Sequence, residues 1–423
     1  MRRPWSAAGR GKRTAGADGR TPDGRTPDGR GGQNPLRILR RRFHAGELGA
    51  VPVVLGLLVV WIIFQSLNGN FLSPRNLSVL SVDIVGIGMI STGVVFVLLL
   101  GEIDLSVGSV SGLAAAAFAV LNVQHGMPEG PALLLAVLCG TAIGAVQGFF
   151  FAKVGVPAFV VTLAGLLGWN GLMVSLLGSS GTLNLDDRGL VAQLTGFYFT
   201  HDAYAYGLAV LGTTGYFLAS YQDVRRRRAA GVPARPLGEL VLRTGVLAVV
   251  SVAAAYVLNQ FQGLPLALLI FLVLLVGLDQ VLCRTRYGRM IFALGGSVEA
   301  ARRTGLNVDL VRISVFMVSG TMAAIGGMFL ASRVTSVSQT SGSGNLLMAA
   351  IAAAVIGGTS MFGGRGRTWS ALLGVLVIQS IASGVALMGI ETAVQYMITG
   401  GVLLVAVVID SLSRRAQRSH GRV

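Results

Sequence analysis

The stretch that decides the fold class of this chain is VLSVDIVGIGMISTGVVFVLLL, residues 79–100. It contains one charged side chain, that of Asp83. A hydrocarbon core about 30 Å thick needs roughly 20 apolar residues for each helix that crosses it. The stretch therefore predicts a transmembrane helix.

Similar apolar stretches follow one another along most of the 423 residues. Hydrophobic residues make up 53% of the chain and charged residues 12%, whereas a soluble globular chain carries about 25% charged residues. The composition argues against a soluble domain and predicts an all-α polytopic integral membrane protein with about twelve transmembrane helices. The predicted helices cover residues 49–67, 79–100, 104–122, 131–151, 156–177, 203–221, 244–262, 264–282, 311–331, 346–362, 369–388 and 394–411.

The formal net charge of +16 raises the question of whether the chain binds nucleic acid. On the predicted helix map, 31 of the 34 basic residues lie on one side of the membrane, and Arg75, Arg188 and Arg333 lie on the other. By the positive-inside rule the basic side faces the cytoplasm. The charge thus predicts a topology with both termini in the cytoplasm, and no nucleic-acid partner is expected.

Outside the apolar stretches the sequence predicts tails and loops but no large soluble domain. Residues 1–46 are rich in Gly, Arg, Asp and Pro, with too few apolar residues to offset the entropy cost of ordering. We expect a disordered basic cytoplasmic tail there, a membrane domain over residues 47–412 and a second cytoplasmic tail over residues 413–423. Four consecutive arginines, Arg225–Arg228, are expected to anchor the orientation of the helix before them.

The residue patterns predict neither catalysis nor a cofactor. Cys139 and Cys283 lie in or beside different predicted helices, so no disulfide framework and no metal motif is expected. A Walker A motif requires Gly-x-x-x-x-Gly-Lys-Ser/Thr, and neither Lys12 nor Lys153 stands in that pattern. The chain is therefore not expected to hydrolyse ATP itself, and a membrane-embedded enzyme would lack a paired catalytic constellation.

One loop on the predicted cytoplasmic side contains ALGGSVEAARRTGLNV, residues 293–308. Ser297 can cap a short helix, Glu299 then lies in its first turn, where a carboxylate favours the helix dipole, and Gly305 can end it. The two alanines that follow Glu299 leave a low-profile surface. We therefore expect a helix that a cytoplasmic partner can cover closely, and an ordinary loop helix is the alternative.

A second motif, GEIDLSVGS at residues 101–109, places two carboxylates between two apolar stretches. A charged side chain at the centre of a bilayer costs about 2.5–3.5 kcal/mol on insertion scales. Asp104 is expected to cap a helix that begins at Leu105. The functional alternative is a broken helix whose polar groups line a cavity, with Glu102 a better candidate than Asp104 for contact with a transported solute.

These motifs carry a resemblance to a known family. The chain resembles the permease subunit of monosaccharide ABC importers over roughly residues 49–412. Two features resemble the xylose-type permease in particular, namely Glu102 in the first motif and an extra helix pair near residues 203–262. The segments that carry the resemblance occur in the order GEIDLSVGS, VPAFVVTLAG at 156–165, ALGGSVEAARRTGLNV, and IGGTSMFGGRG at 356–366.

The resemblance implies a multi-pass protein of a bacterial-type cell membrane with three protein partners. These partners are a second permease chain, a cytoplasmic ABC ATPase and an extracytoplasmic sugar-binding protein, and the transported solute is a monosaccharide such as xylose. The cytoplasmic loop, residues 283–312, would bind the ATPase. The residues implied in coupling are Glu299, Ala300, Ala301 and Gly305.

Passage of a sugar calls for neutral hydrogen-bonding groups and an aromatic face within the helices. Such groups equally serve to hold membrane helices together. The candidates are Gln147, Trp169, Asn170, Gln379 and Ser383, in addition to Glu102 and Asp104. The glycines expected to form an inner hinge are Gly357, Gly358, Gly363 and Gly364.

A different class of function remains open at this point. An ion-coupled secondary transporter of a small polar solute could use Asp83, Glu102 or Asp104 as a proton site. The Glu-Ala-Ala segment at residues 299–301 favours the ATP-driven system, because a secondary transporter has no ATPase to bind.

Overall fold

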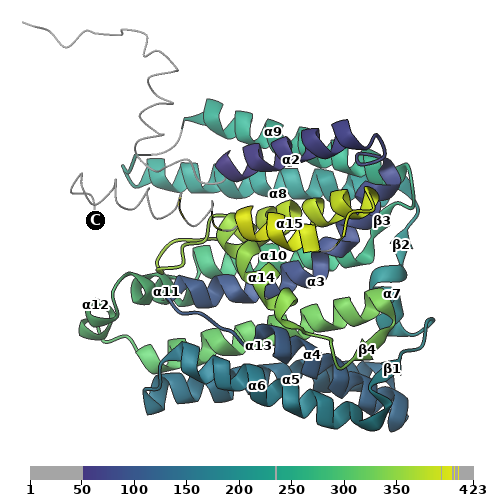
Figure 1. Cartoon of the computed structure of the whole chain (residues 1–423). Helices are drawn as coiled ribbons and strands as arrows, with labels where there is room; N and C mark the ends of the chain where they lie inside the picture. Colours follow the sequence, from purple (N-terminus) through teal and green to yellow (C-terminus); the bar gives the residue numbers. More distant parts are fainter. Residues whose placement is uncertain (1–50, 234–235, 392, 403, 405–407, 409–423) are drawn as a thin grey trace, which may run out of the picture. The chain divides into compact units, whose positions relative to one another are not determined.

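The computed structural model describes residues 51–233, 236–391, 393–402, 404 and 408. Most of them are helical (Figure 1). Residues 393–402 are helical as well. The helices are α2 (Val51–Leu67), α3 (Pro74–Leu99), α4 (Val107–Ala119), η1 (Val120–Gln124), α5 (Glu129–Phe149), η2 (Phe150–Val154), α6 (Ala158–Leu177), η3 (Gly178–Ser180), α7 (Leu190–Gly196), α8 (Asp202–Ala229), α9 (Leu237–Asn259), α10 (Leu266–Arg284), α11 (Arg286–Gly296), α12 (Val298–Arg303), α13 (Val308–Val334), α14 (Gly344–Ile356) and α15 (Trp369–Leu387).

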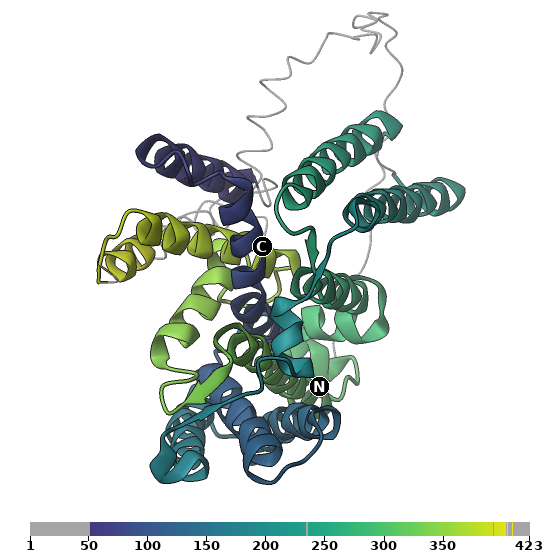
Figure 2. The same ribbon diagram turned by 90° about the vertical axis from the view of Figure 1, so that its right-hand side faces the viewer.

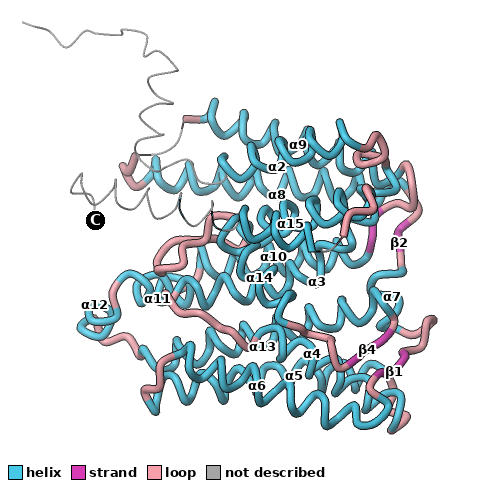
Figure 3. The backbone as a smooth tube through the Cα atoms, in the orientation of Figure 1, coloured by secondary structure: helices cyan, strands magenta, loops and turns pink. Residues whose placement is uncertain are grey.

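Four short strands form two antiparallel ladders at one end of the helices (Figure 3). They are β1 (Thr182–Asn184), β2 (Tyr198–Phe199), β3 (Leu264–Pro265) and β4 (Ser336–Ser338). In the first ladder Leu183 pairs with Val337, and in the second Phe199 pairs with Leu264. The short helix α12 lies at the opposite end of the helices (Figure 3). The two ends therefore differ in character, with strands at one and a projecting helix at the other.

Helix α3 lies at the centre of the core. It packs against α10, α13, α14 and α15, which surround it in Figure 2. From Ile84 onward almost every residue of α3 is buried, because glycines on several faces let neighbours approach. A Cβ on Gly88 would lie 2.5 Å from the ring of Phe271, and one on Gly93 would lie 3.0 Å from the carbonyl oxygen of Ser319.

Helices α5 and α13 are held together by a row of glycines. Gly140, Gly144 and Gly148 follow one another at intervals of four on α5, and such small residues let membrane helices pack closely. A Cβ on Gly144 would lie 2.2 Å from the carbonyl oxygen of Phe316, and one on Gly140 would lie 2.6 Å from that of Gly320. This pair is therefore in direct backbone contact.

The predicted extra helix pair is present as α8 and α9, which lie side by side (Figures 1 and 2). It has a small hydrophobic cluster of its own that includes Ala205, Ala209 and Leu258. Strand β2 comes directly before the pair in the chain and β3 directly after it, and these two strands pair with each other. The ladder between β2 and β3 thus brings together the two ends of the segment that contains α8 and α9.

The expected number of about twelve membrane-spanning helices is not confirmed by the described residues. Within the described residues, eight helices are long and apolar enough to cross a membrane. Two more apolar helices, Val51–Leu67 and Asn345–Ile356, are shorter. The helix expected at 203–221 is present as α8 and is longer than predicted. It is not among the eight, because polar and small residues lower its hydropathy.

Other predicted boundaries agree with the structure to within five residues, with three exceptions. The helix expected at 244–262 begins seven residues earlier, at Leu237, as α9. The helix expected at 346–362 ends at Ile356, because glycines follow and Gly358 has a left-handed backbone with φ of 103°. The helix expected at 394–411 is described only in part, since residues 403, 405–407 and 409–423 lie outside the described residues. The predicted tails at 1–46 and 413–423 lie outside them as well. The cytoplasmic location of both termini stays a prediction.

Candidate functional site

The chain breaks from helical geometry between α3 and α4, as the second motif suggested. Helix α3 ends at Leu99, Leu100 is its C-cap, and Gly101 then adopts a left-handed backbone with φ of 81°. The backbone N–H of Glu102 donates a hydrogen bond to the carbonyl oxygen of Val97 at 3.3 Å. Helix α4 begins only at Val107. The intervening residues form a non-helical segment between the buried end of α3 and the start of α4.

Asp104 lies within this segment and is 3% exposed. One carboxylate oxygen accepts from the backbone N–H of Ser106 at 2.9 Å and from its hydroxyl at 2.6 Å. The other accepts from the hydroxyl of Ser319, on α13, at 3.0 Å. Burial of a carboxylate is costly unless donors surround it, and these three donors fulfil that need.

The expectation that Asp104 caps a helix beginning at Leu105 is wrong. Ser106 occupies the cap position of α4, and it makes no side-chain cap hydrogen bond. Asp104 instead organises the segment before the helix and ties it to α13. The partner Ser319 lies 215 positions along the chain, so the local sequence held no sign of it.

The same network reaches Gln147 on α5. The side-chain amide nitrogen of Gln147 donates to the hydroxyl of Ser106 at 2.9 Å, and Gln147 is 3% exposed. Gln147 also lines a hollow of about 410 Å³ between α5 and α6, together with Trp169. The indole nitrogen of Trp169 is buried without a hydrogen-bond partner in the part of the chain that the structure describes. Three of the predicted pathway residues, Asp104, Gln147 and Trp169, therefore lie in one connected region.

Glu102 is near this region but faces different groups. Half-burial raises the pKa of its carboxyl above the ordinary value, while the positive charge of Arg312 lowers it. The guanidinium of Arg312 lies over the ring of Phe151 at 4.4 Å from its centroid. The same two elements, η2 and α13, also contribute an ion pair, in which Lys153 lies 2.9 Å from the carboxylate of Asp309. Glu102 thus belongs to a group of charges at the start of α13.

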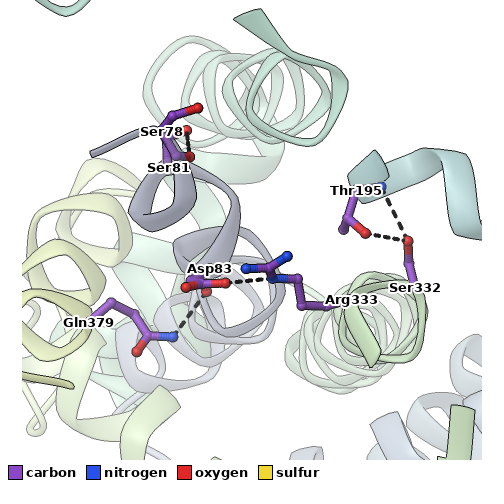
Figure 4. A network of polar contacts seen from close by, with 7 residues as sticks. All are labelled: Ser78, Ser81, Asp83, Thr195, Ser332, Arg333 and Gln379. Carbon is purple, nitrogen blue, oxygen red and sulfur yellow. Dashed lines mark hydrogen bonds and ion pairs between the residues drawn. The ribbon is translucent and has the colours of Figure 1, made fainter. Parts of the chain in front are cut away.

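The remaining pathway candidates do not join this region. Gln379 donates to the backbone carbonyl of Asp83 at 3.0 Å, and Asp83 pairs with Arg333 at 2.8 Å (Figure 4). Ser383 donates to the side chain of Asn76 at 2.9 Å. Asn170 is exposed. Gln379 and Ser383 therefore connect α15 to α3, which is the helix-to-helix role that the sequence left open.

The outer network in Figure 4 also contains a contact that sequence reasoning missed. The hydroxyls of Thr195, on α7, and Ser332, on α13, lie 2.7 Å apart. The Asp83–Arg333 pair is partly exposed, at 34% and 43% of the two side chains. Arg333 stood out in the sequence only as one of three basic residues on the outer side, and nothing there indicated its partner.

The segment predicted to contact a cytoplasmic partner forms α12 as expected in its local details. The hydroxyl of Ser297 accepts from the backbone N–H of Ala300 at 3.3 Å, and Glu299 lies in the first turn. Gly305 follows the helix with φ of 78°. Glu299 is 73% exposed, and among the described residues its side chain is bonded to Arg303 alone, one turn on, at 3.2 Å.

The two alanines of α12 have different surroundings. Ala301 is buried against the chain itself, whereas Ala300 is exposed. The low-profile surface therefore consists of Ala300 and its exposed neighbours rather than of both alanines. Glu299 and Ala300 are exposed on this helix, as are Arg302 and Arg303.

The four glycines predicted as a hinge have unequal surroundings. A Cβ on Gly357 would lie 1.8 Å from the carbonyl oxygen of Ser370, whereas one on Gly358 would meet nothing within 4 Å. Gly363 and Gly364 have left-handed φ values of 85° and 70° and lie against the end of α11. Three of the four, Gly357, Gly363 and Gly364, therefore stand at a contact between separate elements.

Comparison with known proteins now places these features in a family. Residues 76–407 match the model of a family described as the permease component of a branched-chain amino acid transport system. The chain belongs to this family of transport-system permeases. No solved structure matches the permease.

Three curated relatives resemble the permease over most of its length. The xylose transport system permease protein XylH of Escherichia coli K12 is 34% identical over 82% of this chain and 88% of its own. The XylH protein of Haemophilus influenzae is 33% identical over 82% and 92% of the two chains. The ribose import permease protein RbsC of Bacillus subtilis is 30% identical over 89% and 97%.

The family and these relatives confirm the resemblance inferred from the motifs, and the permease is a multi-pass protein of the cell membrane. The named solutes of the relatives are sugars, although the family description names amino acids. Membership in a family of transport subunits also favours a transport role over catalysis and over the ion-coupled alternative.

Proposed function

We propose that the permease is the membrane-spanning subunit of an ATP-driven monosaccharide import system whose sugar is xylose. The observation that carries this proposal is the capped and exposed helix α12, with Glu299 73% exposed, in a chain that is 34% identical to a xylose permease. Helix α12 would bind a cytoplasmic ABC ATPase, which would hydrolyse the ATP. A second permease chain and an extracytoplasmic sugar-binding protein would complete the system.

The proposed docking face on α12 suits a partner that approaches closely. Glu299 has one bonded partner, Arg303, and exposed pairs of this kind contribute about 0.3–0.5 kcal/mol. The carboxylate is therefore readily released to a basic group of an ATPase. Ala300 beside it adds no bulk.

The proposed sugar route passes the hollow between α5 and α6. Its wall is apolar apart from Gln147 and Trp169, and the apolar face of a pyranose packs well on an indole ring. The indole N–H of Trp169 is buried behind this wall without a partner among the described residues, so its side chain would have to turn toward the hollow to donate to a sugar hydroxyl. That hydrogen bond would remove the cost of leaving the N–H unsatisfied. Behind Gln147, the Ser106 and Asp104 network would hold the amide in position.

The substitution Glu299→Arg tests the coupling role. The arginine reverses the charge on the docking face, so we expect loss of xylose uptake and loss of co-purification with the ATPase, at unchanged permease levels in the membrane. Asp223→Arg is the matched control, because Asp223 is 60% exposed and also pairs with an arginine one turn on. Normal uptake by the Glu299→Arg protein would refute the assignment.

Energy source and substrate need separate measurements. In vesicles that contain all the proteins of the system, uptake should stop when ATP hydrolysis is blocked with vanadate and should continue when a protonophore collapses the proton gradient. The opposite pattern would favour the ion-coupled alternative. Uptake of labelled xylose, measured with and without unlabelled ribose, tests which of the two sugars named for the relatives the system prefers.

A further inference from the structure

We infer that Gly295 is a positioning residue of the transport cycle, because it places the end of α11, just before the docking helix α12, in direct backbone contact with the end of α3. The contact is formed by Leu99, Gly101, Gly295, Gly363 and Gly364, which we call the backbone junction. The inference rests on the proposed function, since it assigns a path by which ATPase movement reaches the sugar route.

The first contact of the junction joins α11 to the end of α3. Gly295 is the second-last residue of α11. A Cβ at this position would lie 1.8 Å from the carbonyl oxygen of Leu99 and 2.7 Å from the backbone nitrogen of Gly364. Leu99 is fully buried and ends α3. No residue larger than glycine fits at position 295 unless α11 moves away from α3.

The second contact adds the loop between α14 and α15. The backbone N–H of Gly364 donates to the same Leu99 carbonyl at 2.9 Å. A Cβ on Gly363 would lie 2.7 Å from the carbonyl oxygen of Gly295 and 3.0 Å from the backbone nitrogen of Gly101. Three segments that are far apart in the sequence therefore meet in direct backbone contact.

The positions on either side of the junction explain why it would transmit motion. Gly295 precedes Ser297, the cap of α12, by two residues. On the other side, Gly101 precedes Glu102 and the buried Asp104, whose carboxylate is bonded to α4 and α13. A displacement of α12 would thus move the junction, and through it the non-helical segment after α3 that holds Gln147 in place.

Backbone contact suits this task better than side-chain contact. Side chains can change rotamer and absorb a small shift, whereas closely packed backbone atoms have no such freedom. The left-handed conformations of Gly101 and Gly363, at φ of 81° and 85°, are open to glycine at no steric cost. The junction thus needs glycine both for space and for conformation.

The test compares Gly295→Ala with Gly296→Ala, its neighbour. A Cβ on Gly296 would meet nothing within 4 Å, so Gly296→Ala controls for helix propensity and position. Both proteins are assembled with the ATPase and the sugar-binding protein in proteoliposomes. The measured quantities are xylose uptake, basal ATPase rate, and stimulation of that rate by the loaded binding protein.

We expect Gly295→Ala to keep the assembled complex and the basal ATPase rate while it loses at least tenfold in uptake and most of the stimulation. Gly296→Ala should match the unchanged protein in all three. A purely structural role would lower the amount of protein but leave uptake and stimulation per molecule unchanged, and that result would overturn the inference.

A second variant decides the matter if Gly295→Ala fails to insert. Gly101→Ala is milder, because its Cβ would lie 3.3 Å from the carbonyl oxygen of Phe362 and 3.6 Å from the nitrogen of Gly363. It should give the same loss of stimulation to a lesser degree, and full stimulation would count against the junction. Normal coupling in the junction variants together with loss of uptake in Glu299→Arg would reject the junction alone and leave the proposed function intact.

Discussion

At the scale of single residues, the buried Asp104 shows how one carboxylate organises a helix break. It is 3% exposed and accepts three hydrogen bonds, from the backbone and hydroxyl of Ser106 and from the hydroxyl of Ser319. Hydrogen bonds to charged groups contribute about 1.5–3 kcal/mol. The carboxylate therefore fixes the position of the non-helical segment against α13.

Replacement of this carboxylate should weaken the fold. We expect Asp104→Ala to lower the free energy of unfolding by about 1.5–3 kcal/mol, because it leaves buried donors without an acceptor. The unfolding midpoint of the purified protein in detergent measures the change. Asp187→Ala, at an exposed position in the outer loop, should leave the midpoint unchanged, and equal midpoints for both variants would contradict this role for Asp104.

Trp169 offers a test of the sugar route at the same scale. Trp169→Phe keeps an aromatic ring but removes the buried N–H, which has no partner among the described residues. One hydrogen bond is worth about 1 kcal/mol, so we expect a roughly fivefold rise in the sugar concentration for half-maximal uptake. Leu167→Ala, at a position on α6 that is 71% exposed, is the control. Unchanged uptake by Trp169→Phe would remove the indole N–H from the route.

At the scale of elements, α5 and α13 depend on glycine more than on apolar bulk. Gly144 meets the backbone of Phe316, and Gly320 on α13 meets that of Gly140 in return. This pattern of small residues at intervals of four was visible in the sequence, but its partner helix was not. The sequence therefore indicates which face of α5 packs closely, but not that α13 is the helix that packs against it.

A pair of alanine substitutions on α5 tests this dependence. Gly144→Ala would place a Cβ 2.2 Å from the carbonyl oxygen of Phe316, whereas Gly130→Ala would meet nothing within 4 Å. We expect Gly144→Ala to lower the unfolding midpoint by several degrees and Gly130→Ala to leave it unchanged or slightly raised. Equal midpoints for the two variants would show that α5 and α13 can separate without cost.

Much of the helix pattern could be predicted from apolar length, and the failures have identifiable causes. The stretch at 79–100 became α3, which begins earlier, at Pro74, because Ser73 caps it. The stretch at 203–221 extends to Ala229 because nothing in Arg225–Arg228 breaks a helix. Gly295 was not recognised, since its role depends on Leu99 and Gly364, which lie far away in the sequence.

At the scale of the whole molecule, the direction of the chain across the membrane remains the central prediction. The distribution of arginines places α12 on the cytoplasmic side, and the structure shows α12 and the strand ladders at opposite ends of the helices (Figure 3). If α12 faces the cytoplasm, Asp187 near β1 faces outward.

Labelling of single cysteines tests this orientation. In a background with Cys139→Ser and Cys283→Ser, which removes the two native thiols, Asp187→Cys should react with a membrane-impermeant maleimide in intact cells. Arg303→Cys should react only after the membrane is opened, although its side chain is 78% exposed. Labelling of Arg303→Cys in intact cells would invert the topology and rule out docking of α12 to a cytoplasmic ATPase.

The ladder between β2 and β3 has a consequence for how this permease could have acquired its extra helices. Phe199 and Leu264 are paired across the ladder, so their Cα atoms are only about 5 Å apart. Residues 200–263 therefore begin and end at nearly the same point. A gene could gain or lose that whole stretch in one event without lengthening or straining the rest of the backbone, and the same point is a natural place to graft a reporter domain.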